Sequence, residues 1–307
     1  GVDAIICASP VIIDTAKEKT NLEIHISTQL SSANYEAVNF WYDEGITRVV
    51  LARELNKTEI EELRNNTNAD IEVFIHGGMC VSYSGRCTLS NNMTDRDANR
   101  GGCAHSCRWN YDIFDGETKL NNDLAFAMSS KDLQTVKHIS DLIDIGVNSL
   151  KIEGRMKSIH YIATVVNTYR KLIDDICDDY EIDLPKYLLE IKKAENRLTS
   201  HGFMQGMTTI DEQLYNMRSE NPTQEFIGLV LDYDEEENIA LVEQRNYFLP
   251  GDEVEVFSPN FEPMKFKVED IHDNEDNLLD AARHPKQLLK VFIPFKVSKY
   301  DMIRKIK

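Results

Sequence analysis

The sequence predicts an α/β protein in which strand–helix units with a parallel sheet come first and a small antiparallel β-barrel follows. Two observations indicate this fold class. In the first half of the chain, short apolar runs alternate with helix-like segments across short loops, which is typical of a parallel α/β architecture. From Glu225 onward, short strand patterns are separated by acidic turns that carry Gly or Pro, which is typical of a small antiparallel barrel.

Five apolar runs have the length of buried strands, and they lie near residues 3–7, 22–27, 47–52, 71–76 and 149–153. A closed β/α barrel of this kind needs eight strands. We therefore predict a partial TIM-like β/α barrel. The remaining strands would belong to a missing N-terminal segment, or a partner subunit would complete the barrel.

Helical patterns connect these strands. The predicted helices cover residues 10–18, 32–45, 58–67, 132–146 and 160–177. Thr58 is the predicted N-cap of the third helix, because Glu61 follows three residues later, as a capping box requires.

The change of pattern along the chain predicts the domain boundaries. Residues 1–197 form the partial β/α-barrel catalytic domain, with a cysteine-rich insertion at 77–130. Residues 198–224 look irregular and are predicted to be a linker, and residues 225–307 form the small β-barrel domain.

Charge is distributed unevenly. The net charge of −18 argues against a generally basic nucleic-acid binder. However, residues 283–307 hold eight Lys or Arg and one acidic residue, Asp301, and the cysteine-rich stretch also leans basic. No run of eighteen apolar residues and no signal peptide are visible, so we expect a cytoplasmic protein without a membrane span.

Four of the six cysteines lie in one polar, glycine-rich stretch: Cys80, Cys87, Cys103 and Cys107. Such clustering predicts a four-thiolate metal site, for zinc or an iron–sulfur cluster. The alternative is that some of them are small buried residues. Because the spacing lacks the tight pairs of a common zinc finger, it favours iron–sulfur. Cys7 and Cys177 are interpreted as core or surface residues.

Polar side chains follow the predicted strands, where a β/α barrel carries its active site. The candidate catalytic groups are Glu54, His76 and Glu153. The candidate substrate-binding groups are Gln29, Arg53, Lys151 and Arg155. Arginines there suit a carboxylate or phosphate ligand. Each glutamate could equally neutralise a neighbouring arginine, and the histidine could make a structural hydrogen bond.

Several known catalytic motifs are missing from the sequence. It has no G-x-S-x-G elbow, H-E-x-x-H, P-loop or G-x-G-x-x-G. A hydrolytic mechanism therefore has little local support, although serines occur in "CVSYSGRC".

The stretch "EVFIHGGMCVSYSGRCTLS" resembles the signature of the collagenase-like peptidase family U32. The match extends through "HISTQ", "VVLAREL", "RDANRGGCAHSCRW", "SSKDL" and "SLKIEGRMKS", and so covers almost the whole chain. One departure is Gly78, where the family usually has Ser or Ala. "GVDAIICASP" resembles the family's fourth strand, which implies an N-terminally truncated barrel.

The resemblance implies a particular chemistry. The tail is similar to the branch that forms 5-hydroxyuridine at the wobble position of tRNA, with prephenate as the hydroxyl source. By this resemblance, the four clustered cysteines would hold a [4Fe–4S] cluster, and the strand-end residues would surround the substrate pocket. Two alternatives stay open: a collagenase-like peptidase, and a non-catalytic module with a structural metal site.

Overall fold

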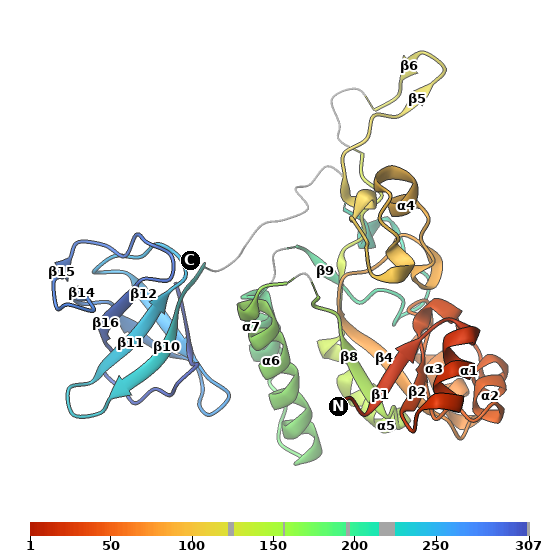
Figure 1. The fold of residues 1–307 in the computed structure, drawn as a ribbon, viewed down its shortest axis with the longest axis horizontal. Coiled ribbons are helices and arrows are strands. Elements are labelled where there is room, and N and C mark those ends of the chain that lie inside the picture. Colours follow the sequence, from red (N-terminus) through yellow and green to blue (C-terminus); the bar gives the residue numbers. More distant parts are fainter. Residues whose placement is uncertain (122–125, 156, 195–196, 215–224, 306–307) are drawn as a thin grey trace. The chain divides into compact units, whose positions relative to one another are not determined.

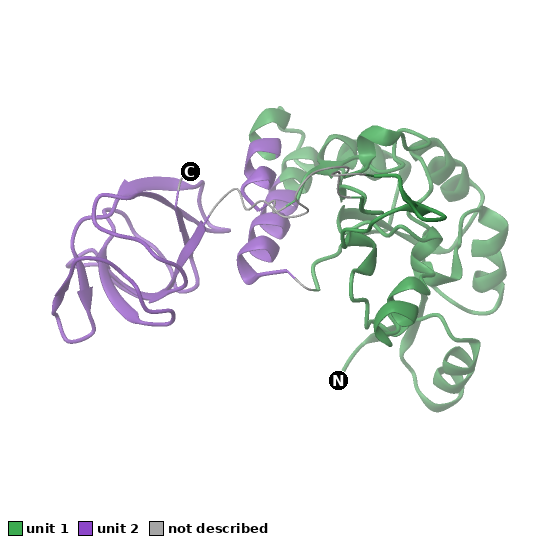
Figure 2. Ribbon diagram, turned by 90° about the horizontal axis from the view of Figure 1, so that it is seen from above, with its two compact units in different colours: residues 1–156, 172–187, 196–221 green, residues 157–171, 188–195, 222–307 purple. Residues whose placement is uncertain are grey.

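The computed structural model describes residues 1–121, 126–155, 157–194, 197–214 and 225–305 (Figure 1). Contacts divide the chain into two compact units, shown in separate colours in Figure 2. The first unit comprises residues 1–156, 172–187 and 196–221, and the second comprises residues 157–171, 188–195 and 222–307. Residues 122–125 of the predicted insertion and 215–224 of the predicted linker lie outside the described residues. None of the described helices is long and apolar enough to cross a membrane.

The first unit is built on a seven-stranded sheet with a parallel core. Its parallel strands lie side by side in chain order: β1 (Ala4–Cys7), β2 (Glu23–Ile26), β3 (Arg48–Val50), β4 (Asp70–Gly77) and β8 (Ser149–Ile152). These are the strands that the apolar runs predict, so the α/β class with a parallel sheet is confirmed. The order of the described strands is open, with β1 at one edge, and a closed TIM barrel is not formed by them.

Two further strands extend this sheet beside the end of β4. Strand β7 (Asp132–Gln134) pairs antiparallel with His76 and Gly77, and β9 (Thr199–Ser200) pairs parallel with β7. The predicted helix 132–146 is therefore wrong over its first residues, and α5 begins at Ile139 and ends at Ile145. The apolar residues have helical spacing, but the backbone edge at the end of β4 pairs with residues 132–134 instead.

Short helices connect the parallel strands: α1 (Pro10–Lys19), α2 (Tyr35–Asp43) and α3 (Lys57–Asn65). The predicted cap at Thr58 is wrong, because α3 begins one residue earlier and Asn56 is its N-cap. The Asn56 side chain accepts the Glu59 N–H at 3.0 Å, and Glu59 accepts the Asn56 N–H at 2.8 Å. The capping box thus lies two residues upstream of the predicted one, and asparagine is at least as good an N-cap as threonine.

The predicted cysteine-rich insertion holds α4 (Leu89–Thr94), β5 (Phe114–Asp115) and β6 (Thr118–Lys119).

The second unit contains an antiparallel eight-stranded sheet that forms a half-barrel. Its strands are β10 (Glu225–Asp234), β11 (Ile239–Gln244), β12 (Glu253–Phe257), β13 (Met264–Lys267), β14 (Ile271–Asp273), β15 (Leu278–Leu279), β16 (Leu288–Phe292) and β17 (Met302–Lys305). β17 lies between β10 and β12. The core holds alternating residues such as Val230, Val242, Val254 and Val291, as a half-buried sheet requires.

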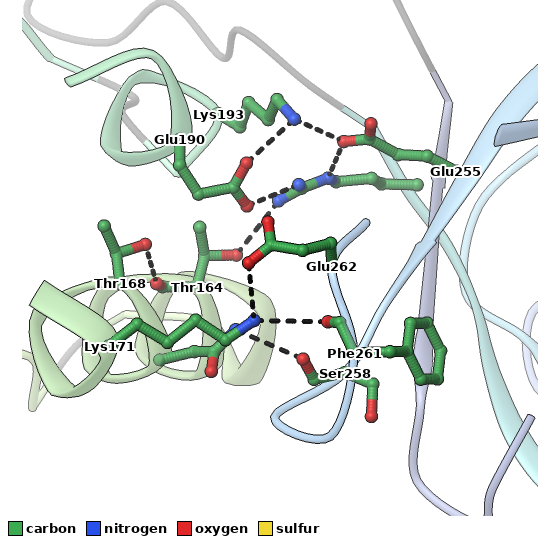
Figure 3. Close-up of polar contacts among 11 residues, drawn as sticks. Thr164, Thr168, Lys171, Glu190, Lys193, Glu255, Ser258, Phe261 and Glu262 are labelled. Atoms are coloured by element: carbon green, nitrogen blue, oxygen red, sulfur yellow. Dashed lines mark hydrogen bonds and ion pairs between the residues drawn. The ribbon is translucent and has the colours of Figure 1, made fainter. Parts of the chain in front are cut away.

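The second unit also includes parts of two helices, α6 (Ile159–Cys177) and α7 (Leu184–Lys192). A buried ion network joins them to the half-barrel (Figure 3). The Arg304 guanidinium contacts Glu255 at 2.6 Å and Glu190 at 2.5 Å, and Lys193 contacts Glu255 at 2.7 Å. Arg304 also lies 4.4 Å from the Phe257 ring.

The basic segment 283–307 does not present a cationic surface of the kind that its sequence suggests. Arg304 is fully buried. Other cations of the segment pair with carboxylates: Arg283 with Asp280, Lys290 with Asp276, Lys296 with Glu235 and Lys305 with Asp252. Acidic turns of the same domain supply these carboxylates, so most of the local positive charge is neutralised.

Candidate functional site

The four clustered cysteines lie beyond the carboxyl end of β4. All are free thiols; Cys87 is buried and the other three are half-buried. The pKa of Cys80 is raised by burial and also by the nearby Cys87 and Cys103 thiols. The pKa of Cys107 is raised by burial. The nearby Arg108 lowers it, and the other three thiols raise it further. Cys80 and Cys107 are therefore each within electrostatic reach of the other clustered thiols.

Backbone N–H groups also point at these sulfur atoms. The Ser82 N–H donates to Cys80 Sγ and the His105 N–H donates to Cys103 Sγ, both at 3.4 Å. Burial alone would raise the pKa of Cys87, but hydrogen bonds from Ser90, Ser82 and Leu89 lower it overall. Such donors stabilise thiolates and tune thiolate-held clusters.

The four thiols are of a chemical type that binds metals, although they do not stand in a metal-binding arrangement. Across the described residues, no three His, Cys, Asp or Glu side chains stand in a ready metal-binding arrangement. Metal binding can be coupled to the folding of the residues that hold the metal. By its chemistry the set of four thiols fits a thiolate-held cluster, and its sulfur atoms would have to rearrange on binding.

Glu54 holds the cysteine loop in shape. Its carboxylate accepts the Ser84 N–H at 2.6 Å and the Ser84 hydroxyl at 3.2 Å. Ser84 has a φ of 48°, in the left-handed region that is unfavourable for a residue with a side chain. The two hydrogen bonds compensate for this strain and fix the turn between Cys80 and Cys87.

Glu153, directly after β8, binds the turn that leads into the cysteines. Its own N–H donates to the His76 carbonyl at 2.8 Å. Its carboxylate accepts the Gly78 N–H at 3.1 Å and the Arg155 N–H at 3.2 Å. β4 and β8 are thus locked together where the cysteine loop begins. His76 itself is buried, with 1% of its surface exposed.

Gly77→Ala is expected to destabilise the first unit by about 2 kcal/mol, because Gly77 has a φ of +116° and a β-carbon there would lie 2.3 Å from the Glu153 carbonyl oxygen. Urea unfolding of both variants would measure this. Gly45→Ala is the matched control: Gly45 also has a positive φ, of +81°, but nothing lies within 4 Å, so we expect about 1 kcal/mol. Equal losses in the two variants would contradict the close-contact argument.

Arg53 is the arginine most closely joined to this turn. Its Nη1 donates to the Gly78 carbonyl at 3.0 Å, and its guanidinium lies 3.8 Å from the Phe74 ring centre. Burial lowers the pKa of Arg53, opposed by the charges of Glu153, Cys80 and Glu54. Its Nε is buried and has no hydrogen-bond partner among the described residues. Arg53 thus retains a donor beside the cysteine loop.

Two arginines that the sequence did not single out as site residues lie beside the same turn. Arg108 donates to the Met79 carbonyl at 3.3 Å and lies 3.5 Å from Asp132. Arg197 lies 3.3 Å from the same Asp132 carboxylate, with only 5% of its side chain exposed. The position of Arg108 next to Cys107 was a usable signal. No such signal marked Arg197, because the pairing of β7 with β9 brings it close to Asp132 only in the folded chain.

The other predicted site residues lie in two different settings. Lys151 donates to Glu72 at 2.6 Å, and Ser149 donates to the same carboxylate at 2.8 Å. Burial would raise the pKa of Glu72, but these partners lower it overall. Gln29 and Arg155 instead reach the cysteine-rich insertion, where they donate to the carbonyls of Asn99 and Gly101. The structure therefore brings Arg53, Glu54 and Glu153 together at the loop, and pairs Lys151 with Glu72.

Comparisons with known proteins identify the family of the chain. The model of peptidase family U32 matches residues 1–214, and that of the U32 C-terminal domain matches residues 222–304. The chain is 48% identical to tRNA hydroxylation protein P1 of Bacillus subtilis, over 99% of this chain and 74% of that protein. It is 33% identical to tRNA hydroxylation protein P of Escherichia coli, over 84% of this chain and 68% of that protein.

One solved structure is similar in sequence to part of the chain. The C-terminal domain of a Geobacillus thermoleovorans U32 peptidase is 51% identical and covers 27% of this chain and 93% of that domain, with a TM-score of 0.27. Both family models match, and together they span nearly all of the sequence. The chain therefore belongs to peptidase family U32.

Proposed function

We propose that this chain is an RNA-modifying hydroxylase that forms 5-hydroxyuridine at the wobble position of tRNA. The observation that carries the proposal is the 48% identity, over 99% of the chain, to a protein named for tRNA hydroxylation. Four thiols gathered beyond one strand end, beside several arginines, are consistent with it. Because tRNA is the substrate, the place of action would be the cytoplasm.

The reaction replaces a C–H bond of the base by a C–OH bond, which is a two-electron oxidation; prephenate would lose its hydroxyl group, take up a hydrogen in its place and so be reduced by the same two electrons. Cys80, Cys87, Cys103 and Cys107 would hold the iron–sulfur cluster, which supplies one-electron transfer when bound. Glu54 would keep the loop between the first two ligands in position through Ser84. N–H donors to the sulfur atoms would offset the negative charge of the ligated group.

The proposal includes prephenate, a dicarboxylate, as the hydroxyl source. Arginine recognises carboxylates through paired N–H donors. Arg53, Arg108 and Arg197 lie around the Gly78–Met79 turn or its neighbour Asp132. Asp132 and Glu153 orient these groups and balance part of their charge. The buried Nε atoms of Arg53 and Arg197 have no hydrogen-bond partner among the described residues, which suits an acid ligand at this position.

The same proposal extends to the fold. The consecutive parallel strands β1 to β4 and β8 would be one part of a TIM-like β/α barrel, and a further segment or a partner subunit would supply the rest. At the open edge, Ile6 of β1 is 49% exposed, and Val11 and Ile12 of α1 are 72% and 52% exposed. Covering these side chains would bury apolar surface that the sheet leaves in water.

Expression of the chain in a bacterium that lacks its own tRNA uridine hydroxylation proteins would test the function. We expect 5-hydroxyuridine, or nucleosides derived from it, to reappear in digested tRNA, as measured by mass spectrometry. Anaerobically purified chain should do the same in vitro only when prephenate is present. Unmodified tRNA in both assays would contradict the proposal. Cleavage of denatured collagen by the same preparation, free of trace proteases, would favour the peptidase alternative that the family name suggests.

A further inference from the structure

An acidic chain that modifies RNA needs a local surface on which phosphate groups are attracted rather than repelled. The net charge is −18. Segment 283–307 is rich in Lys and Arg, but most of these side chains are paired with carboxylates or buried, as described above. Since a carboxylate beside a cation cancels most of its field, that segment is a poor place for RNA to bind.

Three exposed arginines of the first unit have a different environment. Arg86, Arg100 and Arg155 form no ion pair with a carboxylate among the described residues. Arg86 donates to the Gln29 carbonyl at 2.7 Å, and Arg155 donates to the Gly101 carbonyl at 2.9 Å. A carbonyl orients a guanidinium without neutralising its charge, so the remaining N–H donors stay available to an anion.

Hydrogen bonds place these arginines around one short stretch of backbone, residues 99–101. Gln29, whose carbonyl holds Arg86, donates its side-chain amide to the Asn99 carbonyl at 3.2 Å. Arg100 follows Asn99, and Arg155 is bound to Gly101. The Asn99 amide also donates to the Cys87 carbonyl at 3.4 Å. The stretch is therefore joined directly to the cysteine site.

An exposed aromatic side chain belongs to the same group. Tyr83 is 56% exposed, and its carbonyl accepts the Arg86 N–H at 3.0 Å in the same short turn. Single-stranded nucleic acids are bound by this combination of cations for the phosphates and an aromatic ring on which a base stacks.

We propose that Arg86, Arg100, Arg155 and Tyr83 form the surface that binds the single-stranded loop of the RNA substrate. We call it the loop-binding patch. The arginines contact phosphates on either side of the reacting nucleotide, and Tyr83 stacks on a neighbouring base. The inference rests on the proposed function for the identity of the RNA, and it assigns Arg155 to the phosphates rather than to a small carboxylic acid.

The salt dependence of binding tests the patch. The probe is a synthetic anticodon stem–loop RNA with a wobble uridine, bound to the full chain carrying its metal group. Each phosphate contact with a single strand contributes about 0.7 to the slope of log Kd against log salt. The variant R86Q/R100Q/R155Q should therefore lose about 2 from the slope and bind more weakly. Tyr83→Ala should bind about tenfold more weakly with an unchanged slope.

A matched variant separates the patch from the overall charge. R283Q/K290Q/K296Q removes the same number of positive charges from positions that are paired with carboxylates, and its slope should equal that of the wild type. Arg100→Gln alone, at an exposed side chain, should lower the slope by about 0.7 without affecting folding. Equal slopes for the wild type, the patch triple variant and Arg100→Gln would overturn the inference.

Binding and chemistry are read separately, so the two proposals can fail independently. Binding that depends on the patch, without any 5-hydroxyuridine formed, would support the loop-binding patch and contradict the proposed function. Hydroxylation by a patch triple variant whose affinity and slope equal those of the wild type would support the function and overturn the patch.

Discussion

Replacement of Cys103 by alanine is expected to abolish the proposed iron binding and to reduce tRNA hydroxylation by more than about 100-fold. Loss of groups that only support a metal ligand already lowers metal affinity or activity by about 10–100-fold, so loss of a ligand should have a larger effect. Iron and sulfide per chain, the visible absorption spectrum and the 5-hydroxyuridine content of tRNA would measure it. The wild-type protein must be purified without oxygen for this comparison.

Cys177→Ala is the matched control for that prediction. Cys177 lies on α6, is exposed, and is separated from the cysteine loop in the sequence. The same chemical change there should leave the iron content, the spectrum and hydroxylation at wild-type values. Iron content that is unchanged in Cys103→Ala would contradict the assignment of the ligands. Zinc without iron in the wild-type protein, with no hydroxylation, would point instead to a structural metal site.

The parallel sheet could be predicted from the sequence because its strands are short, largely apolar runs, a pattern favoured by burial on both faces, which is most complete in β4. Residues 132–134 could not be predicted in the same way. Leu133, Val136, Ile139 and Leu142 have helical spacing and are all buried, yet the first of them is in a strand. The pairing of residues 132–134 with the end of β4 depends on a contact that spans more than fifty residues of the chain.

The cysteines of the candidate site could be found from composition, because thiols seldom gather in a polar loop without a chemical reason. The roles of the surrounding charges could not. Glu54 and Glu153 both accept backbone N–H groups of the turn and loop, which is a geometric fact that no spacing reveals. In the same way, segment 283–307 looks basic in the sequence, and only the folded half-barrel shows the carboxylates that pair with it.

Replacement of Arg304 by methionine is expected to destabilise the second unit by about 3–5 kcal/mol, because removing one member of a buried ion network leaves the others without a counter-charge. Arg304 is fully buried, and Glu255, its partner at 2.6 Å, is 2% exposed. The network joins α6, α7, β12 and β17 through Thr164, Glu190 and Glu255 (Figure 3). Urea unfolding, followed by far-UV circular dichroism, would measure the loss.

The pH dependence of unfolding gives a second measurement on the same variant. Burial, together with the nearby Arg304 charge, lowers the pKa of His160 to about 4. Between about pH 6.5 and pH 4 the unfolded chain binds a proton at His160 that the folded chain excludes. The stability that depends on neutral His160 is therefore fully present above about pH 6.5 and is lost as the pH falls toward 4. Without Arg304 the pKa of His160 should rise, and the acid loss of stability should become smaller.

Two further variants decide whether the effect comes from burial of the charges. Arg283 pairs with Asp280 on the surface, with side chains 48% and 81% exposed, so Arg283→Met should change stability by less than about 1 kcal/mol. The double variant R304M/E255L removes both of the most buried charges and should recover part of the loss, since apolar groups can replace a buried pair with little change. An Arg304→Met protein as stable as Arg283→Met would show that the network does not hold α6 and α7 to the half-barrel. A double variant less stable than Arg304→Met would show that Glu255 stabilises the fold through Lys193, whose amine lies 2.7 Å away, even without the arginine.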